Sequence, residues 1–209
     1  MPHFLLIRHG LPHEGHPQRP GDPPLHPLGR RHAERLARQL AREGIARIVS
    51  SPQQRAIDTA APLARLLGLE PEIHEGLAEV DHGVARYRSV ETVRAEEPER
   101  WPLFMKSPAR FFGRDPEEYR RRVRSTFDAI VTAPGGERIA VFSHGMTIKT
   151  ILCAALGVAD DAYARFLIAH CSVTRVSGSA PDRLRVDSVN ESICKPAPAH
   201  VAVAARGGP

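Results

Sequence analysis

The chain has 209 residues, 42% of them hydrophobic and 25% charged, which is typical of a soluble globular protein large enough for a full sheet-and-helix core. No apolar run approaches the roughly 20 residues that span a bilayer, and Arg8 and His9 interrupt the first apolar segment too early for a signal peptide. We therefore expect a cytoplasmic protein. The three cysteines have no CxxC spacing and are expected to be reduced packing residues; they are Cys153, Cys171 and Cys194.

The net charge is +5, and most basic residues are arginines, because Lys occurs only at positions 106, 149 and 195. An Arg-rich positive balance suits anionic partners such as phosphate esters or nucleic acid. The chain has no concentrated basic run with interleaved aromatic residues, which argues against a nucleic-acid partner.

The N-terminal stretch 3–10 reads HFLLIRHG. Its apolar run is typical of a strand buried on both faces of a parallel sheet, and polar residues at the end of such a strand lie where open α/β sheets bind ligands. Arg8 supplies a guanidinium fork that suits phosphate, and His9 supplies a nitrogen nucleophile that can be neutral near pH 7. Gly10 allows the backbone to turn sharply and leaves room for a substrate.

Residues 11–27 contain six prolines and two glycines, which predicts a long loop. Four side chains of this loop could reach a ligand held at His9; they are His13, His16, Arg19 and His26. A helix is predicted over 28–43, with Gly44 as its stop, and a second strand over 45–49.

The segment after the second strand predicts a helix start. Ser51 is a good N-cap, and Gln54 would complete an S-x-x-Q capping box for a helix that runs to Leu67. Arg55 then lies in the first helical turn, where free N–H groups and the helix dipole favour an anion. A plain turn with a surface arginine is the alternative interpretation.

A short third strand is predicted over 70–74, and the loop at 76–83 carries Glu79, Asp81 and His82. Acids near a strand end suit proton transfer, although solvated loop acids show the same pattern. Residues 84–114 are rich in Arg and Glu and are predicted to leave the sheet and cap the site. We expect one helix there, over 89–97, and Pro98, Pro102 and Pro108 are expected to break the rest of the segment.

The next helix is predicted to begin at Asp115 with an acidic capping box and to end at Pro134-Gly135-Gly136. A fourth strand over 138–142 finishes in Ser143-His144-Gly145 and leads into a helix over 147–156. Segments 168–176 and 184–189 alternate in polarity, which predicts an antiparallel hairpin added to the sheet. We expect a single domain over 1–195 and a loosely held C-terminal tail over 196–209.

The motifs LLIRHG and AVFSHG share one sequence pattern, an apolar strand followed by a polar residue, His and Gly. If these strands are neighbours in a parallel sheet, His9 and His144 face each other at its carboxyl edge. Together with Arg8, Arg55 and Glu79 they suit phosphoryl transfer through a histidine. The arginines would stabilise the anion, one imidazole would attack phosphorus, and the acid would protonate the leaving oxygen and then deprotonate a water.

The chain resembles the histidine phosphatase superfamily, the phosphoglycerate mutase-like group, over residues 4–189. The matching words appear in the family's order and spacing; they are IRHG at 7–10, PLGRRHAERLA at 27–37, SSPQQRAIDTA at 50–60, LAEVDHG at 77–83 and FSHG at 142–145. The resemblance implies a three-layer α/β/α sandwich with a mainly parallel central sheet. It also implies that no metal or other cofactor is required.

Carried over by position, the resemblance implies that His9 is the histidine that becomes phosphorylated and that Glu79 is the acid/base residue. It implies a phosphate pocket around His9 made by Arg8, Arg55 and His144, with His144 also counted among the catalytic residues. Asp81 is a nearby alternative for the acid.

Three departures from the mutases favour a hydrolase. Leu11-Pro12-His13-Glu14-Gly15-His16 stands where mutases have an acid and then a Trp-Asn pair, Met146 stands where they often have Asn, and the chain is shorter. The expected function is therefore a phosphomonoesterase acting on a small anionic phosphate ester through phosphohistidine at His9. A phosphoglycerate mutase-type phosphotransferase is the nearest alternative.

Two further alternatives belong to other functional classes. A His-rich metal-binding protein is suggested because six of the 11 histidines lie within the first 32 residues, but their spacings match no standard zinc pattern. A non-catalytic phosphate-binding module would lack one of the five expected groups, and none is missing. No nucleic-acid or membrane partner is expected. The substrate, the oligomeric state, with a homodimer as one option, and the role of the 11–27 loop histidines stay open.

Overall fold

A computed structural model describes residues 1–133 and 137–192. Its centre is a six-stranded sheet in the order β3-β2-β4-β1-β5-β6. Four strands run parallel, namely β3 (Glu72–Ile73), β2 (Arg47–Ser50), β4 (Arg138–Ser143) and β1 (His3–Arg8). Antiparallel β5 (Ser172–Ser177) and β6 (Arg185–Ser192) complete the sheet beside β1. The predicted hairpin and the mainly parallel sheet are confirmed.

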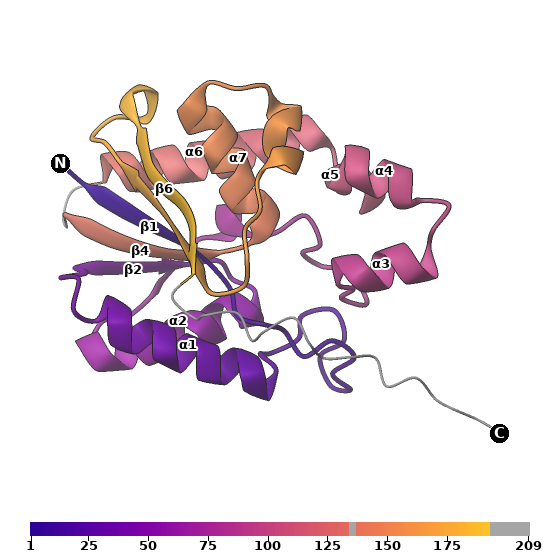
Figure 1. Cartoon of the computed structure of the whole chain (residues 1–209), viewed down its shortest axis with the longest axis horizontal. Coiled ribbons are helices and arrows are strands. Elements are labelled where there is room, and N and C mark those ends of the chain that lie inside the picture. The colour runs from indigo at the N-terminus through magenta and orange to yellow at the C-terminus, as the bar shows by residue number, and fades with distance from the viewer. Residues whose placement is uncertain (134–136, 193–209) are drawn as a thin grey trace.

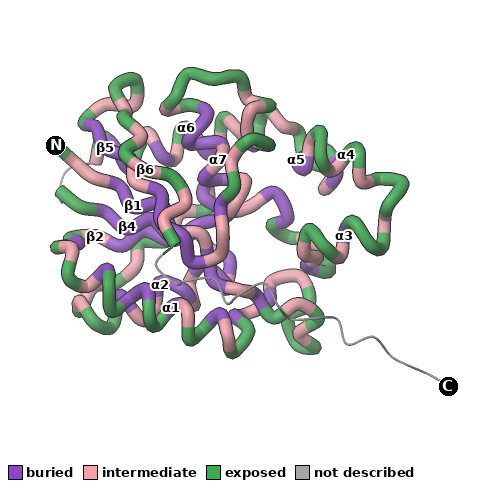
Figure 2. Tube along the Cα trace, viewed as in Figure 1, coloured by how far each residue is buried: buried purple, intermediate pink, exposed green. Residues whose placement is uncertain are grey.

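Helices cover both faces of this sheet, which makes the expected three-layer α/β/α fold (Figure 1). Helices α1 (Pro27–Leu40) and α2 (Gln54–Leu67) pack on one face, where Leu5 and Ile7 of β1 point. Helices α6 (Pro116–Thr132) and α7 (Gly145–Leu156) pack on the other, against Phe4 and Leu6. Successive side chains of a strand point to opposite faces, so the unbroken apolar run of β1 serves both layers. The tube in Figure 2 shows burial concentrated in the central strands β1, β2, β4 and β5, while β3 and β6 at the edges contain no buried residue.

The predicted end of α2 is confirmed, at Leu67 with Gly68 in the left-handed conformation, whereas α1 ends earlier than expected, at Leu40. Asp115 caps α6 through its side chain, which accepts from the Glu118 amide. Cys153 and Cys171 are buried, and Cys153 is a free thiol. The expected helix end at 134–136, the tail at 196–209 and Cys194 lie outside the described residues.

The predicted Ser51–Gln54 capping box is wrong. Helix α2 begins two residues later than that box requires, with Gln53 rather than Ser51 at the N-cap position. The Gln54 amide donates to Asp22 of the 11–27 loop at 2.9 Å. The Gln54 side chain donates instead to Asp58, within its own helix. A carboxylate from a distant loop caps the helix, which releases the Ser51 hydroxyl for another partner.

The 84–114 segment holds more helix than expected. The predicted helix is found as α3 (Val90–Glu96), but α4 (Trp101–Lys106) and α5 (Pro108–Phe111) come after it. Pro102 and Pro108 lie in the first turns of these helices, where a missing N–H breaks no hydrogen bond, so they start helices rather than prevent them. Three short 3₁₀ segments complete the described chain; they are η1 (Glu75–Leu77), η2 (Asp160–Arg165) and η3 (Pro181–Arg183).

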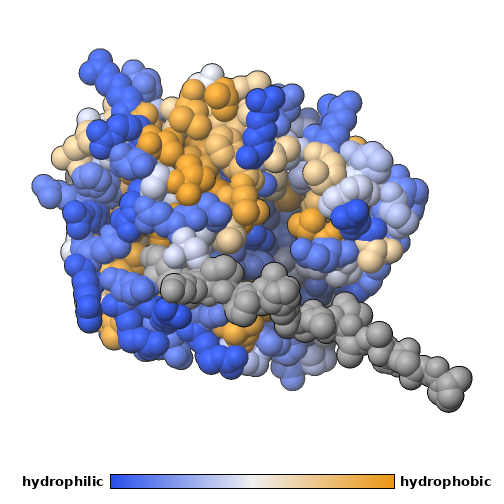
Figure 3. All heavy atoms as spheres, in the orientation of Figure 1, coloured by the Kyte–Doolittle hydropathy of each residue, from blue (hydrophilic) through white to orange (hydrophobic). Residues whose placement is uncertain are grey.

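The surface drawn in Figure 3 is mostly hydrophilic. An apolar area interrupts it over the part of the fold where β6 and the segment after α7 lie. Exposed apolar side chains at the end of α7 and in the segment after it include Leu156, Val158 and Leu167. No helix among residues 1–133 and 137–192 is long and apolar enough to cross a membrane.

Candidate active site

The two His-Gly words meet at the carboxyl edge of the sheet. Strands β1 and β4 pair in parallel with Arg8 opposite Ser143, so the residues that come after each strand, His9 and His144, lie side by side. Their ring centroids are 5.1 Å apart. Strand β2 pairs with the other edge of β4 and leads into the first turn of α2, which carries Arg55. The expected neighbours β1 and β4 are therefore confirmed.

His9 is held in one orientation by the turn behind it. Its Nδ1 lies 2.8 Å from the Gly10 carbonyl oxygen, which can only accept, so Nδ1 carries the proton and the neutral ring keeps its lone pair on Nε2. A Cβ on Gly10 would lie 3.0 Å from the Gly29 carbonyl oxygen, which explains the glycine. Burial, followed by the charges of Arg55 and His144, lowers the pKa of His9 well below 6.5.

His144 is held in place by the Ser51 hydroxyl, which had been predicted to cap α2. Its Nε2 lies 2.7 Å from the Ser51 Oγ, and Ser51 also accepts from the Gln53 amide. With Ser51 as donor to Nε2, the proton of His144 resides on Nδ1, which is buried and has no hydrogen-bond partner among the described residues. Burial and the charges of Arg55 and Arg8 lower the pKa of His144 well below 6.5.

Two arginines supply the positive charge of the site. Arg55 is 1% exposed, donates from Nη2 to both Asp81 carboxylate oxygens at 2.7 and 3.0 Å, and lies 4.9 Å from the Tyr87 ring centroid. Arg8 donates from Nη1 to the Ile168 carbonyl at 2.6 Å. Within the described parts of the chain, the Nε of both arginines and the Nη1 of Arg55 are buried without a partner.

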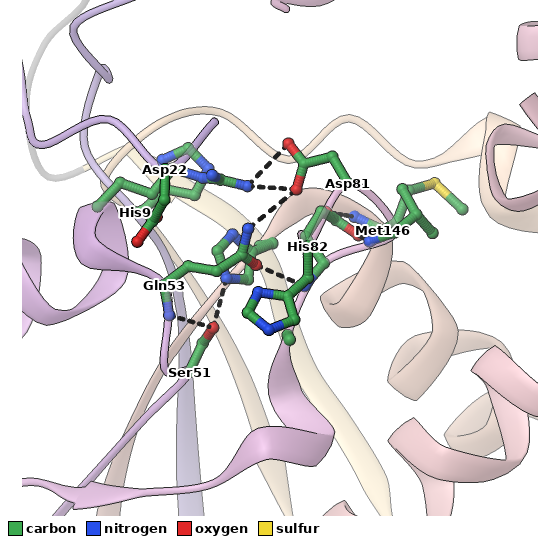
Figure 4. A network of polar contacts seen from close by, with 12 residues as sticks. His9, Asp22, Ser51, Gln53, Asp81, His82 and Met146 are labelled. Carbon is green, nitrogen blue, oxygen red and sulfur yellow. Dashed lines mark hydrogen bonds and ion pairs between the residues drawn. The ribbon is translucent and has the colours of Figure 1, made fainter. Parts of the chain in front are cut away.

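The two candidate acids have different partners. Asp81 is the partner of Arg55 and also accepts from Gln53, so its charge is neutralised locally (Figure 4). Glu79 accepts from neutral donors, the Val80 amide, the Tyr119 hydroxyl and the Met146 amide, at 2.9, 2.9 and 2.8 Å. Burial, assisted by the Asp81 charge, raises the pKa of Glu79 above 4.5. These neutral partners and the raised pKa suit Glu79 to proton transfer better than Asp81. Glu79 also lines a cavity of about 350 Å³, whose other lining residues belong to 80–82 and 113–122 and do not include His9.

The sequence interpretation missed three residues of this site. Gln53 donates to Asp81 and accepts from the Glu79 amide, Tyr87 packs against Arg55, and the His170 ring centroid lies 5.3 Å from that of His9. The sequence predicted an antiparallel hairpin in the sheet, but neither its neighbouring strand nor its direction relative to β1. The antiparallel pairing of β5 with β1 is what brings the segment before β5 to the edge where His9 lies. No local sequence signal points to Tyr87.

The 11–27 loop histidines form a separate group. The ring of His13 packs edge-on against those of His16 and His26, with centroids 5.2 and 5.7 Å away. His26 accepts from the Leu28 amide and caps α1. Across the described residues, no group of three or more His, Cys, Asp or Glu side chains is arranged to hold a metal ion.

Residues 4–192 match the family model of the histidine phosphatase superfamily, branch 1. The chain belongs to this superfamily. Curated relatives agree: "Probable phosphoglycerate mutase GpmB" of Yersinia enterocolitica is 32% identical over 160 residues, which cover 74% of each chain. The protein of the same name from Yersinia pestis is 31% identical over the same length.

Solved structures share the superfamily fold. A mycobacterial glucosyl-3-phosphoglycerate phosphatase superposes with a TM-score of 0.77 at 24% identity, covering 92% of this chain and all of that one. A phosphoserine phosphatase from Entamoeba histolytica gives 0.68 at 22% identity, covering 91% of this chain and 97% of the other. At these identities the likeness establishes the fold alone, so the relatives named as a mutase and the neighbours named as phosphatases leave the reaction to be argued from the site.

Proposed function

We propose that the chain is a phosphomonoesterase that hydrolyses a small anionic phosphate ester through a phosphohistidine on His9. The observation that carries this proposal is a set of buried nitrogen atoms, without partners in the described chain, around His9; Arg8, Arg55 and His144 contribute them. Buried polar groups are normally hydrogen-bonded, and an orphaned donor costs about 1–3 kcal/mol. A phosphoryl group offers several acceptor oxygens and the negative charge that these donors match.

In the first step, the His9 Nε2 lone pair attacks phosphorus in line with the leaving oxygen. The N–P bond forms as the P–O bond to the alcohol breaks, and Glu79 gives its proton to that oxygen. The protonation states suit this step because burial shifts the two groups in opposite directions. The pKa of His9 falls and that of Glu79 rises, which favours a neutral imidazole beside a protonated carboxyl.

In the second step, the Glu79 carboxylate takes a proton from water as the water oxygen attacks the phosphohistidine. The P–O bond to water forms, the N–P bond breaks, and the electron pair returns to Nε2. Arg8, Arg55 and the Nδ1–H of His144 hold the equatorial oxygens in both steps. Asp81 keeps Arg55 in place by accepting from its Nη2 with both carboxylate oxygens. This contact leaves the Nε and Nη1 donors of Arg55 for the phosphoryl group.

The mutase alternative is supported by the names of the curated relatives. It uses the same phosphohistidine but returns the phosphoryl group to a substrate hydroxyl instead of water. Incubation with 3-phosphoglycerate and a bisphosphate primer separates the two reactions. We expect free phosphate, whereas formation of the 2-phosphate isomer at a higher rate than free phosphate would establish a mutase.

The test of the proposal is turnover of an aryl phosphate by the wild type and by His9→Ala. We expect kcat to fall by about 10⁴-fold or more, because the nucleophile is removed. His3→Ala is the matched control, since His3 begins β1 and lies at the opposite end of that strand from Arg8 and His9. Full activity in His9→Ala would end the proposal.

A further inference from the structure

The segment before β5 brings a third imidazole to the site. Strand β5 runs antiparallel to β1, so the residues just before it, 168–171, lie at the carboxyl edge of β1. The ring centroid of His170 is 5.3 Å from that of His9, almost the same as the 5.1 Å between His9 and His144. His9 therefore packs against two imidazoles, of which only His144 takes part in the steps proposed above.

The backbone around His170 is firmly held. The Cys171 amide lies 3.0 Å from the Arg8 carbonyl and 3.3 Å from the His9 carbonyl, and Arg8 donates to the Ile168 carbonyl. The Ala169 amide donates at 2.7 Å to the side chain of Asn190 in β6. The segment thus shares its hydrogen bonds with the residues of the phosphate site, and its position is coupled to theirs.

This arrangement includes an unfavourable backbone conformation. Cys171 has a φ of +55°, a left-handed conformation that residues with a Cβ seldom adopt. Such conformations cost of order 1–3 kcal/mol and occur mainly where the surrounding structure enforces them at functional sites. Here the backbone turn at Cys171 sets the position of His170, whose ring lies beside that of His9.

The His170 side chain is not explained by packing alone. Its Nε2 is buried and has no hydrogen-bond partner among the residues described. An apolar residue would fill the space without leaving a buried nitrogen unpaired, which costs about 1–3 kcal/mol. Burial, with the charges of Arg8 and Arg55, lowers the pKa of His170 to about 3, so the ring stays neutral at ordinary pH.

We propose that His170 is a further phosphate-contacting residue, whose neutral imidazole donates from Nε2–H to an oxygen of the phosphoryl group transferred to and from His9. This inference rests on the proposed function, since it deepens the same site. Two arginines already supply charge there, and a neutral donor adds a directed hydrogen bond without repelling the developing phosphohistidine. Phosphate recognition then uses two imidazoles that flank His9, His144 after a parallel strand and His170 before an antiparallel one.

The test compares two substitutions that separate the ring from its donor. His170→Gln retains an amide N–H that reaches about as far as the imidazole Nε2, and His170→Phe retains an aromatic ring without a donor. We measure kcat/KM for an aryl phosphate and inhibition by orthovanadate, an anion that mimics five-coordinate phosphorus. His3→Phe is the control for replacing a histidine by phenylalanine, because His3 lies at the opposite end of β1 from His9.

We expect His170→Phe to lower kcat/KM by about 10²-fold and to weaken vanadate inhibition by a similar factor, the usual cost of one oxyanion donor. His170→Gln should recover at least about tenfold of this loss, because the donor returns. A folded His170→Phe protein with wild-type kcat/KM and vanadate inhibition overturns the inference. Equal losses in the Gln and Phe variants overturn it as well, because they would indicate a role for the ring rather than for Nε2–H.

Failure to fold is addressed by thermal melts and a second pair of variants. If His170→Phe does not melt cooperatively, His170→Gln is compared with His170→Asn, whose shorter amide matches Nδ1 rather than Nε2. Higher activity and tighter vanadate binding in the Gln variant are expected, and equality overturns the inference.

The proposed function can fail independently of this inference. If the wild type hydrolyses no phosphate ester, calorimetric titration with inorganic phosphate still tests His170. Weaker phosphate binding in His170→Phe then supports an anion contact without catalysis, and unchanged binding overturns the contact itself.

Discussion

Arg175 of β5 differs from the two arginines of the candidate site, Arg8 and Arg55, in how its charge is neutralised. Arg175 donates from both terminal nitrogens to the Glu43 carboxylate, at 2.6 and 2.8 Å, and from Nε to Glu191 at 2.9 Å. Every nitrogen of this guanidinium therefore has a carboxylate partner. At the carboxyl edge of the sheet, Arg55 has one carboxylate partner and Arg8 has a backbone carbonyl, and nitrogen atoms of both are buried without a partner in the described chain.

The difference indicates what each group is for. A guanidinium surrounded by carboxylates joins elements of the fold, here β5, β6 and the turn after α1. A buried guanidinium with spare donors holds positive charge that the protein itself does not neutralise, and an anion can complete it. The Arg175 contacts therefore stabilise the fold, whereas the Arg8 and Arg55 contacts prepare a site for phosphate.

The strongest way to break this comparison is to replace one arginine of each group by lysine. Arg55→Lys keeps the charge but loses the fork, so it should lower kcat/KM for an aryl phosphate by about 10³-fold. Arg175→Lys should leave kcat/KM within about twofold and lower the free energy of unfolding by about 1 kcal/mol. Steady-state kinetics and urea denaturation measure the two effects. Equal losses of activity in both variants would show that the two groups do not differ in function.

The carboxylates offer a second comparison. Glu43 is bound to a cation, whereas Glu79 accepts only from neutral donors among the described residues and has a raised pKa because of burial. Glu79→Gln should lower kcat/KM, which reports the phosphorylation step, by about 10²-fold for an alkyl phosphate and by much less for a nitrophenyl phosphate, because a good leaving group needs no proton. Glu43→Gln is the control and should show no dependence on the leaving group. An equal loss for both esters would remove Glu79 from the role of acid.

The pH dependence of stability sharpens the comparison further. The pKa values of His9 and His144 lie below 6.5 in the folded protein, through burial and neighbouring charges, and return to about 6.5 on unfolding. The unfolded chain then binds more protons below pH 6.5, so the free energy of unfolding falls as the pH falls through 6.5. Each histidine contributes a slope of at most about 1.4 kcal/mol per pH unit.

The Arg175 group acts in a different pH range. Burial opposes the shift, but hydrogen bonds from Ser188 and Arg175 lower the pKa of Glu191 below 4.5, so its contribution is lost only under more acidic conditions. Melting temperatures between pH 7.5 and 5.5 should therefore fall in the wild type and in Arg175→Lys, and fall less in His144→Gln. A flat profile in the wild type would contradict the assigned pKa shifts.

The smallest effect is expected at Tyr119, which donates to Glu79 at 2.9 Å and contacts Thr147 at 3.0 Å. Burial first, and then the nearby Glu79 charge, raises the pKa of Tyr119 well above 10, so it stays a donor. Tyr119→Phe removes a hydrogen bond that lowers the pKa of Glu79, and the alkaline limb of kcat/KM should move to higher pH, with an activity loss of about three- to tenfold. Tyr163→Phe, which loses a bond to the Met105 carbonyl, is the control. An alkaline limb that stays in place would exclude this tuning role.

The sequence predicted the parts of the site that depend on strand order. An apolar run that ends in Arg8-His9-Gly10, and another that ends in His144-Gly145, placed two histidines at one sheet edge because parallel strands end together. Arg55 was correctly placed in the first turn of α2, although the first residue of this helix and its cap were not. The cap comes from Asp22, a residue brought near only by the folded 11–27 loop, and no local pattern could show it.

Residues that reach the site through long-range packing could not be found from local patterns. Tyr87 belongs to the irregular 84–114 segment, and its contact with Arg55 depends on how that segment returns to the sheet. His170 was treated as part of an alternating strand, and its place beside His9 depends on the antiparallel pairing of β5 with β1, which the sequence did not predict. The helices at 101–111 were missed because the prolines there were interpreted as breakers rather than as first-turn residues.

His9 is proposed to carry the phosphoryl group during turnover. The most direct measurement is to mix Glu79→Gln with a nitrophenyl phosphate, quench in alkali, where phosphohistidine is stable, and map the phosphorylated peptide by mass spectrometry. We expect the phosphoryl group on the peptide that contains His9, where it accumulates because the second step lacks its base. It should be absent from the double variant that also carries His9→Ala. Turnover with no phosphorylated peptide, or with the phosphoryl group on any other residue, would contradict the account.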